Sequence, residues 1–250
     1  MSGVGKTTAA RALARKHDLR LYSLDARTYE HESKVPPETR SLDELWVHST
    51  PEELANWFEE HARRRFPFVL EDLARIEDDA PVLVDGPQLL PELVASRGRA
   101  LFVVAAPSLQ RELVAARGSR AYARTRDPER ALENRLARDA ILAERLRRAA
   151  PVAEIGDVRE TEHVVESFFE PLIGDWIENP DHGDGGARRR DENEARVRQI
   201  RAHLDATGGE DSREVELACE CAQRGCGATV RMSLRHAETS QRPRLAPGHR

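Results

Sequence analysis

The chain has 250 residues, enough for one medium-sized domain and a small appendage. Its composition, with 39% hydrophobic and 33% charged residues, is that of a folded protein with a solvated surface, and its net charge of -5 gives no reason to expect general nucleic-acid binding. No apolar run reaches the about 18 residues of a membrane span, and the N-terminus has no apolar signal-peptide core, so we expect a cytoplasmic protein without a membrane partner.

The first predicted element is a phosphate-binding loop at the N-terminus. Residues 3–8 read Gly-Val-Gly-Lys-Thr-Thr, which matches the second half of the pattern G-x-x-x-x-G-K-[ST]. In this pattern glycines allow backbone N–H groups to face phosphate oxygens, the lysine contacts the outer phosphates and the hydroxyl binds Mg²⁺. The chain has only three lysines, so this match weighs against the alternative of a Gly-rich tail ahead of a helix. The candidate nucleotide-binding residues are Gly3, Val4, Gly5, Lys6, Thr7 and Thr8.

A buried parallel strand usually runs into such a loop, and no residues precede Met1 to form one. The lost ladder hydrogen bonds and apolar burial amount to on the order of 10 kcal/mol, which rivals the stability of a whole domain. We therefore expect the natural protein to start upstream of Met1.

Short apolar runs alternate with helical patterns along residues 1–177, which predicts an α/β fold with a parallel sheet covered on both faces. Strands are expected at residues 19–24, 81–84, 100–105 and 150–155. Helices are expected at residues 8–17, 51–65, 68–76, 107–117, 128–149 and 160–173, with Pro67 as a break.

Two acidic residues follow predicted strands and are candidates for catalysis. Asp25 could accept the proton of an attacking hydroxyl, and Asp85 resembles the Walker B acid that holds Mg²⁺. An Asp after a strand can equally form a turn or cap a helix. Among the arginines of residues 117–130, Arg120 and Arg124 are candidates for a lid that closes over phosphates, and a solvated charged face is the alternative.

Taken together, residues 3–8, Asp25, residues 84–86 and the Arg-rich segment resemble the nucleoside and nucleotide kinases of the P-loop class, which include shikimate- and adenylate-kinase-type enzymes. The resemblance covers residues 1–175. It implies a three-layer P-loop fold with a parallel sheet of order 2-3-1-4-5, here without its first strand. It also implies ATP and Mg²⁺ as cosubstrates and a small-molecule phosphate acceptor.

The expected activity is transfer of the γ-phosphate of ATP to a nucleoside, a nucleotide or a similar acceptor. Two alternatives remain open at this point: a nucleotide-binding regulatory module that transfers nothing, and an NTPase in which water replaces the acceptor. Acceptor-dependent release of ADP would separate the three.

The composition changes after residue 177. Residues 178–212 read as a linker rich in Pro, Gly and Asp followed by a charged helix over residues 187–204 that stops near Gly208. All three cysteines lie in the remaining segment, residues 213–250. An odd number of clustered cysteines is a poor disulfide framework and a better metal or redox site.

The tail resembles a short Cys-rich segment of actinobacterial proteins of unassigned function. Cys219, Cys221, Cys226 and His249 would satisfy a tetrahedral Zn²⁺ ion, and His236 competes with His249 for the fourth place. Three reduced thiols in a loose tail are the alternative.

Overall fold

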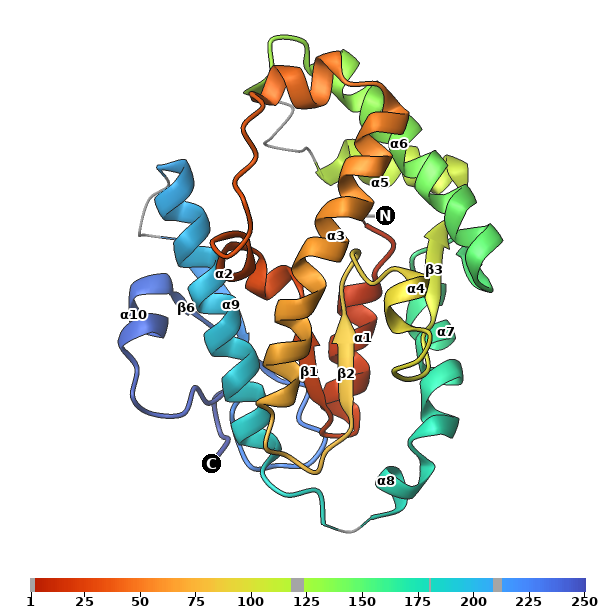
Figure 1. Cartoon of the computed structure of the whole chain (residues 1–250). Helices are drawn as coiled ribbons and strands as arrows, with labels where there is room; N and C mark the ends of the chain where they lie inside the picture. The colour runs from red at the N-terminus through yellow and green to blue at the C-terminus, as the bar shows by residue number, and fades with distance from the viewer. Residues whose placement is uncertain (1–2, 118–123, 180, 209–212) are drawn as a thin grey trace. The chain divides into compact units, whose positions relative to one another are not determined.

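The computed structural model describes residues 3–117, 124–179, 181–208 and 213–250 (Figure 1). The chain forms two compact units, each assembled from separated segments. Unit 1 consists of Met1–Lys6, Val35–Arg75 and Pro87–Val164, and unit 2 of Thr7–Lys34, Ile76–Gly86 and Val165–Arg250. The fold is mixed α/β, and within the described residues each sheet has two strands. The linear division expected at residues 177 and 212 remains a prediction.

The sheet of unit 1 pairs β3 (Phe102–Ala105) with β4 (Val152–Ile155) in parallel. These are two of the four expected strands. Val103, Ala105 and Ile155 are buried and pack with Val4 from the N-terminal loop. The loop therefore lies against the carboxyl end of this sheet, because Ala105 and Ile155 are the last residues of their strands.

The helices of unit 1 are the π-helical turn η2 (Glu44–His48), α3 (Pro51–Ala74), α4 (Pro91–Val94), α5 (Pro107–Arg117), α6 (Pro128–Ala149) and the first half of α7 (Glu160–Phe169). Helices α3 and α6 enclose an apolar cluster with Leu54, Trp46 and Ala131 at its centre. Asn134 of α6 donates to the carbonyl of Trp46 at 3.0 Å, which satisfies a buried carbonyl of η2.

Helix α3 is continuous through Pro67, so the break predicted there is wrong. Pro67 is exposed, and its ring points away from the apolar face that buries Leu54, Phe66 and Val69. Thr50 and Glu53 form a capping box at the start of the helix. Burial of that face and the cap together outweigh the about 3 kcal/mol that an interior proline costs.

The predicted helix over residues 160–173 is also too long, because α7 ends at Phe169. A short 3₁₀ turn, η4 (Glu170–Leu172), follows it. Pro171 has no backbone N–H to continue the α-helical ladder, so the chain tightens there.

Unit 2 contains the other predicted parallel pair, β1 (Arg20–Ser23) and β2 (Val82–Asp85), with Ser23 opposite Asp85. Helix α1 (Lys6–Lys16) precedes β1, and the short helices η1 (Asp25–Arg27), α2 (Thr28–Glu32) and α8 (Gly174–Glu178) complete this part. A Cβ on Gly86 would lie 2.6 Å from Cβ of Leu24. Only glycine therefore fits at position 86, where the chain leaves β2 beside the end of β1.

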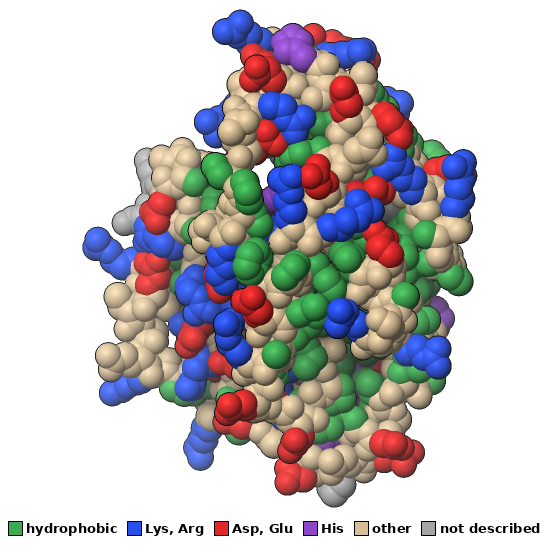
Figure 2. All heavy atoms as spheres, viewed as in Figure 1, with side chains coloured by type: hydrophobic (Ala, Val, Ile, Leu, Met, Phe, Trp, Pro, Cys, Tyr) green, Lys and Arg blue, Asp and Glu red, His purple; other side chains and the backbone are tan. Residues whose placement is uncertain are grey.

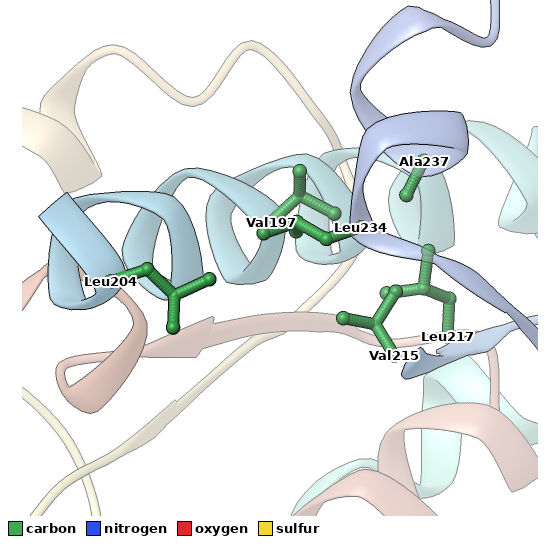
Figure 3. Close-up of a cluster of buried hydrophobic side chains, with 6 residues drawn as sticks. All are labelled: Val197, Leu204, Val215, Leu217, Leu234 and Ala237. Carbon is green, nitrogen blue, oxygen red and sulfur yellow. The ribbon is translucent and has the colours of Figure 1, made fainter. Parts of the chain in front are cut away.

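The C-terminal part of unit 2 consists of α9 (Gly185–Thr207), the antiparallel hairpin β5 (Glu214–Ala218) and β6 (Thr229–Ser233), and α10 (Leu234–Thr239). Helix α9 starts two residues before the predicted Ala187 and ends at Gly208, which has φ of 67°. The apolar residues of all three elements form one core (Figure 3). Its buried members are Val197, Leu204, Val215, Leu217, Leu234 and Ala237. The tail is therefore a folded layer on α9.

On the face shown in Figure 2, Lys and Arg side chains are interspersed with Asp and Glu side chains. Many charged side chains of the protein pair at short sequence distance, for example Arg64 with Glu60 and Arg148 with Glu144. Such pairs add little stability each but keep a helix surface solvated.

Candidate metal centre and nucleotide loop

The loop between β5 and β6 carries all three cysteines. The hairpin continues one residue beyond β5, since the N–H of Cys219 donates to the carbonyl of Ala228 at 2.9 Å. Residues 219–228 then form a closed loop, the cysteine loop, in which Cys219, Cys221 and Cys226 are buried. All three are free thiols in the structure.

A tight turn brings His249 to the same place. The N–H of His249 donates to the carbonyl of Ala246 at 3.0 Å, and Gly248 has φ of 82°. Proline at the second position and a left-handed glycine at the third fit a type II turn. The turn is fastened to the loop because the N–H of Ala246 donates to Sγ of Cys219 at 3.2 Å. His236 is exposed on α10 and is not part of the cluster, so the structure selects His249 from the two candidates.

The four side chains converge on one point. Sγ of Cys219 and Sγ of Cys221 each lie 3.4 Å from Nδ1 of His249, and Sγ of Cys226 lies 3.5 Å from it. The four ligand atoms all lie within 4.8 Å of one another. With Zn–S near 2.3 Å and Zn–N near 2.0–2.1 Å, ideal tetrahedral geometry places sulfur and nitrogen about 3.5 Å apart. The cluster therefore has the ligand types and spacing that could hold a metal ion such as zinc.

The electrostatics of the thiols also fit a cation. Burial raises the pKa of Cys221, but hydrogen bonds to its sulfur from His249 and from the Gln223 backbone outweigh burial and bring that pKa down to about 7. The pKa of Cys226 is raised to about 11 by burial and by the neighbouring thiols. The three sulfurs cannot all ionise side by side without positive charge, which a metal ion would supply.

A polar network behind the loop holds its backbone. Glu220 is buried, and its carboxylate accepts from Asn193 at 2.8 Å, from the N–H of Arg244 at 2.9 Å and from the Arg244 guanidinium at 2.5 Å. Asn193 also exchanges two hydrogen bonds of 2.9 Å with the backbone of Ala218. Desolvation by burial raises the pKa of Glu220, but these hydrogen bonds dominate and leave it lowered. Through Asn193, helix α9 thus holds Ala218 and Glu220, the residues on either side of Cys219.

The approach of α9 to this loop depends on Gly186. A Cβ there would lie 2.6 Å from the carbonyl oxygen of Glu220 and 3.0 Å from that of Cys221. We expect Gly186→Ala to lower the free energy of unfolding by about 1–3 kcal/mol through overpacking, although alanine favours a helix by about 1 kcal/mol. Urea unfolding in the presence of Zn²⁺ measures the change.

Gly227→Ala is the matched control for that substitution, because nothing lies within 4 Å of a Cβ at Gly227. If Gly186→Ala were more stable than the unsubstituted chain, the close approach of α9 would be wrong.

The N-terminal loop has the backbone that its glycines predict. Gly3 and Gly5 have φ of 101° and 85°, in the region that only glycine adopts without strain. A Cβ on Gly3 would lie 2.9 Å from Cβ of Leu113. The hydroxyl of Thr161 donates to the carbonyl of Val4 at 2.5 Å, which fixes the bend within unit 1. Thr161 belongs to no motif in the sequence, so its contact with the loop could not be predicted.

Lys6 is the last residue of the N-terminal segment of unit 1, and Thr7 and Thr8 begin the first segment of unit 2. Asp25 and Asp85 lie at the same edge of the β1–β2 sheet, because the N–H of Leu24 donates to the carbonyl of Asp85 at 2.8 Å. Asp25 is exposed and Asp85 is buried. Oδ2 of Asp85 finds no hydrogen-bond partner within the described part of the chain.

Arg120 and Arg124 are the two candidates for a lid. Arg124 is exposed in unit 1, and Arg120 lies outside the described residues.

No protein-family model, curated protein or solved structure matches this chain. Over the described ranges, no helix combines the length and the apolar character that a membrane span requires.

Proposed function

We propose that this chain binds a structural zinc ion through Cys219, Cys221, Cys226 and His249. The observation that carries the proposal is the equal spacing of the three sulfurs around Nδ1 of His249, at 3.4, 3.4 and 3.5 Å. Four protein ligands close a tetrahedral site and leave no open position for a substrate, which is typical of structural rather than catalytic zinc.

The ion would offset two of the three negative charges of the thiolates and would cross-link the cysteine loop to His249. Around it, Ala246 is buried and Val230 and Leu245 pack partly buried, so the ligands are shielded from water. The tail contributes a core of only a few apolar residues, and a metal ion is a common way to stabilise so small a layer.

Zinc content tests this proposal directly. The purified chain should contain about one zinc ion per molecule, and Cys221→Ser and His249→Ala should lose most of it. His236→Ala is the matched control, since His236 lies outside the cluster and should leave the zinc content unchanged. A purified chain that neither contains zinc nor takes it up on addition would contradict the proposal.

We propose as a second function that the N-terminal loop binds the phosphates of ATP and that Mg²⁺ is held nearby, as in P-loop kinases. The positive φ of Gly3 and Gly5 directly ahead of α1 supports it, because such a bend turns backbone N–H groups toward an anion at a helix N-terminus. If the strand expected upstream of Met1 is counted as strand 1, then β1 to β4 would be strands 2 to 5. The observed pairs β1–β2 and β3–β4 are then the neighbours 2-3 and 4-5 of the expected order 2-3-1-4-5.

In this proposal Lys6 would contact the outer phosphates, Thr7 would bind Mg²⁺, and Asp85 would hold a metal-bound water through its unpartnered oxygen. Asp25 would accept the proton of the acceptor hydroxyl, and Arg120 and Arg124 would cover the phosphates. The acceptor would be a small molecule that carries a hydroxyl or a phosphate group.

We expect Lys6→Ala to weaken binding of Mg²⁺-ATP by about 10- to 100-fold, because a charge-assisted contact contributes about 1.5–3 kcal/mol. Isothermal titration calorimetry measures the affinity. Lys34→Ala is the control, since Lys34 lies outside the loop and pairs with the exposed Glu30. Equal affinity of Lys6→Ala and the unsubstituted chain would argue against the loop as a phosphate site.

Release of ADP separates the remaining alternatives. A kinase would release ADP faster with the correct acceptor, an NTPase would release it without one, and a regulatory module would do neither.

A further inference from the structure

One arginine that is not a metal ligand donates to three backbone carbonyls of the cysteine loop. Arg189 of α9 is 4% exposed. Its Nε donates to the carbonyl of Cys219 at 2.8 Å, and its Nη2 donates to the carbonyls of Cys221 at 2.5 Å and Gln223 at 3.3 Å. One planar guanidinium thus fixes the backbone at two metal ligands and between the second and the third. A lysine could not make these bonds at once, because its three N–H donors all leave one nitrogen, whereas a guanidinium donates from three nitrogens in a planar fork.

The remaining nitrogen of the Arg189 guanidinium binds Asp18. Nη1 of Arg189 donates to Oδ1 of Asp18 at 2.6 Å, and both side chains are buried. Oδ2 of Asp18 accepts from the N–H of Gly225, in the same cysteine loop, at 3.2 Å. Asp18 therefore holds the loop directly on one oxygen and through Arg189 on the other.

Asp18 itself has an unusual backbone. It lies in the turn between α1 and β1 with φ of 50°, the one left-handed non-glycine residue of the described chain. Non-glycine residues adopt this conformation rarely, and it persists where surrounding contacts impose it. Those contacts come from α9 and from the cysteine loop: besides its carboxylate bonds, the carbonyl of Asp18 accepts from Arg188 of α9 at 2.9 Å.

The fit between these segments is close. A Cβ on Gly185 would lie 2.5 Å from Oδ1 of Asp18, so α9 can begin beside this turn only with glycine there. On the loop side, a Cβ on Gly225, which has φ of 65°, would lie 3.3 Å from the carbonyl oxygen of Lys16. The cysteine loop is therefore seated against the C-terminal end of α1.

We propose that Arg189 and Asp18 are positioning residues for the metal site. They hold the cysteine loop in its metal-binding conformation, so that metal binding and ordering of the α1–β1 turn form one coupled equilibrium. The inference rests on the proposed zinc function and adds its regulation: a change at the turn alters metal affinity, and metal binding in turn stabilises the turn, by the same free energy.

Titration with Co²⁺ tests the first half of the coupling, because thiolate–cobalt charge-transfer bands report the ligand set directly. We expect Arg189→Lys and Asp18→Asn to weaken Co²⁺ binding by about 10- to 100-fold, the usual effect of groups that orient metal ligands. At saturating Co²⁺ the band intensity should equal that of the unsubstituted chain, since no ligand has been removed. Arg198→Lys is the matched control on α9, because Arg198 is exposed and pairs with Glu194 on the same helix.

Hydrogen exchange of the unsubstituted chain tests the second half and needs no variant. Zinc should slow exchange of the backbone amides of residues 17–20 as well as those of residues 219–228. The same peptides in Cys221→Ser should exchange at one rate with and without zinc.

Three outcomes are distinguishable. Failure of the unsubstituted chain to bind Co²⁺ or Zn²⁺ would overturn the zinc function together with this inference. Normal metal binding with equal affinity in Arg189→Lys, Asp18→Asn and Arg198→Lys would overturn the inference alone. So would zinc that protects residues 219–228 but leaves residues 17–20 unchanged.

Discussion

Chelation of the metal is expected to lower the melting temperature of unit 2 by about 8 °C or more. A ligand present at about a thousand times its dissociation constant adds about 4 kcal/mol, and a chain of this size shifts by about 2–4 °C per kcal/mol. The three cysteine ligands are buried and the segment that the ligands cross-link spans residues 219–249, so loss of the ion leaves three thiols in a site from which water is largely excluded. Differential scanning calorimetry with and without EDTA measures the shift.

Cys221→Ser should reproduce the melting temperature of the chelated chain and should not respond to EDTA. His236→Ala should keep both the higher temperature and the response. A chain of verified zinc content whose transition is the same before and after chelation would contradict a stabilising role for the ion.

Replacement of Asp139 by alanine is expected to cost about 3–5 kcal/mol of unfolding free energy, the usual result of removing one partner of a buried ion pair. Asp139 lies on α6 with no exposed surface. Its carboxylate accepts from Nε of Arg138 at 3.0 Å and from Nε of Arg135 at 3.1 Å. Arg138 is buried between the rings of Trp46 and Phe58, at 5.3 and 5.4 Å from their centres. Without Asp139 the buried guanidinium of Arg138 would lose its carboxylate partner in the core of unit 1.

Urea unfolding at about pH 7 measures this cost. Glu133→Ala is the control, because Glu133 lies on the same helix, is exposed and pairs with Arg130 at 3.6 Å. Equal stability of Asp139→Ala and Glu133→Ala would mean that the buried pair contributes nothing net.

The same carboxylate gives a pH dependence. Burial raises the pKa of Asp139, but the charges of Arg138 and Arg135 outweigh burial and hold that pKa at about 2, below its ordinary 3.8. A lowered pKa in the folded state adds stability above the unfolded value, and this stability disappears as the pH falls toward 2. We expect about 2 kcal/mol to be lost between about pH 5 and pH 2, and Asp139→Asn to lack this part of the acid dependence. Acid titrations of unfolding for both chains compare them.

The sequence predicted the parallel strands well, because each is a short apolar run with a polar or helix-starting residue on either side. It also located the charged helix that became α9. The error at Pro67 arose because a proline is a local signal, while the apolar face of α3 on both sides of it is what decides the length of that helix.

The metal ligands could be predicted only in part. Three clustered cysteines were enough to suggest a metal, but the choice between His236 and His249 depended on the turn at Gly248, which the sequence analysis did not recognise. The hairpin around the cysteines was also missed, although Glu214-Val215-Glu216-Leu217 alternates as an amphipathic strand does.

The contacts of Arg189 and Asp18 could not be predicted from the sequence. A guanidinium that donates to carbonyls leaves no spacing pattern, since the acceptors are backbone atoms of any residue type. The left-handed turn at Asp18 gives no signal either, because Asp is common in ordinary turns as well.

The segmental build of unit 2 bears on its synthesis. Helix α1 and strand β1 are translated early. Arg189 and the cysteine loop, which hold Asp18, are translated only after residue 184. Contacts between residues so far apart in the sequence form slowly and late. During synthesis the α1–β1 turn therefore lacks the contacts that hold Asp18 in the folded protein. Chaperone dependence and zinc supply during translation should therefore influence the yield of native protein more than they influence its stability once folded.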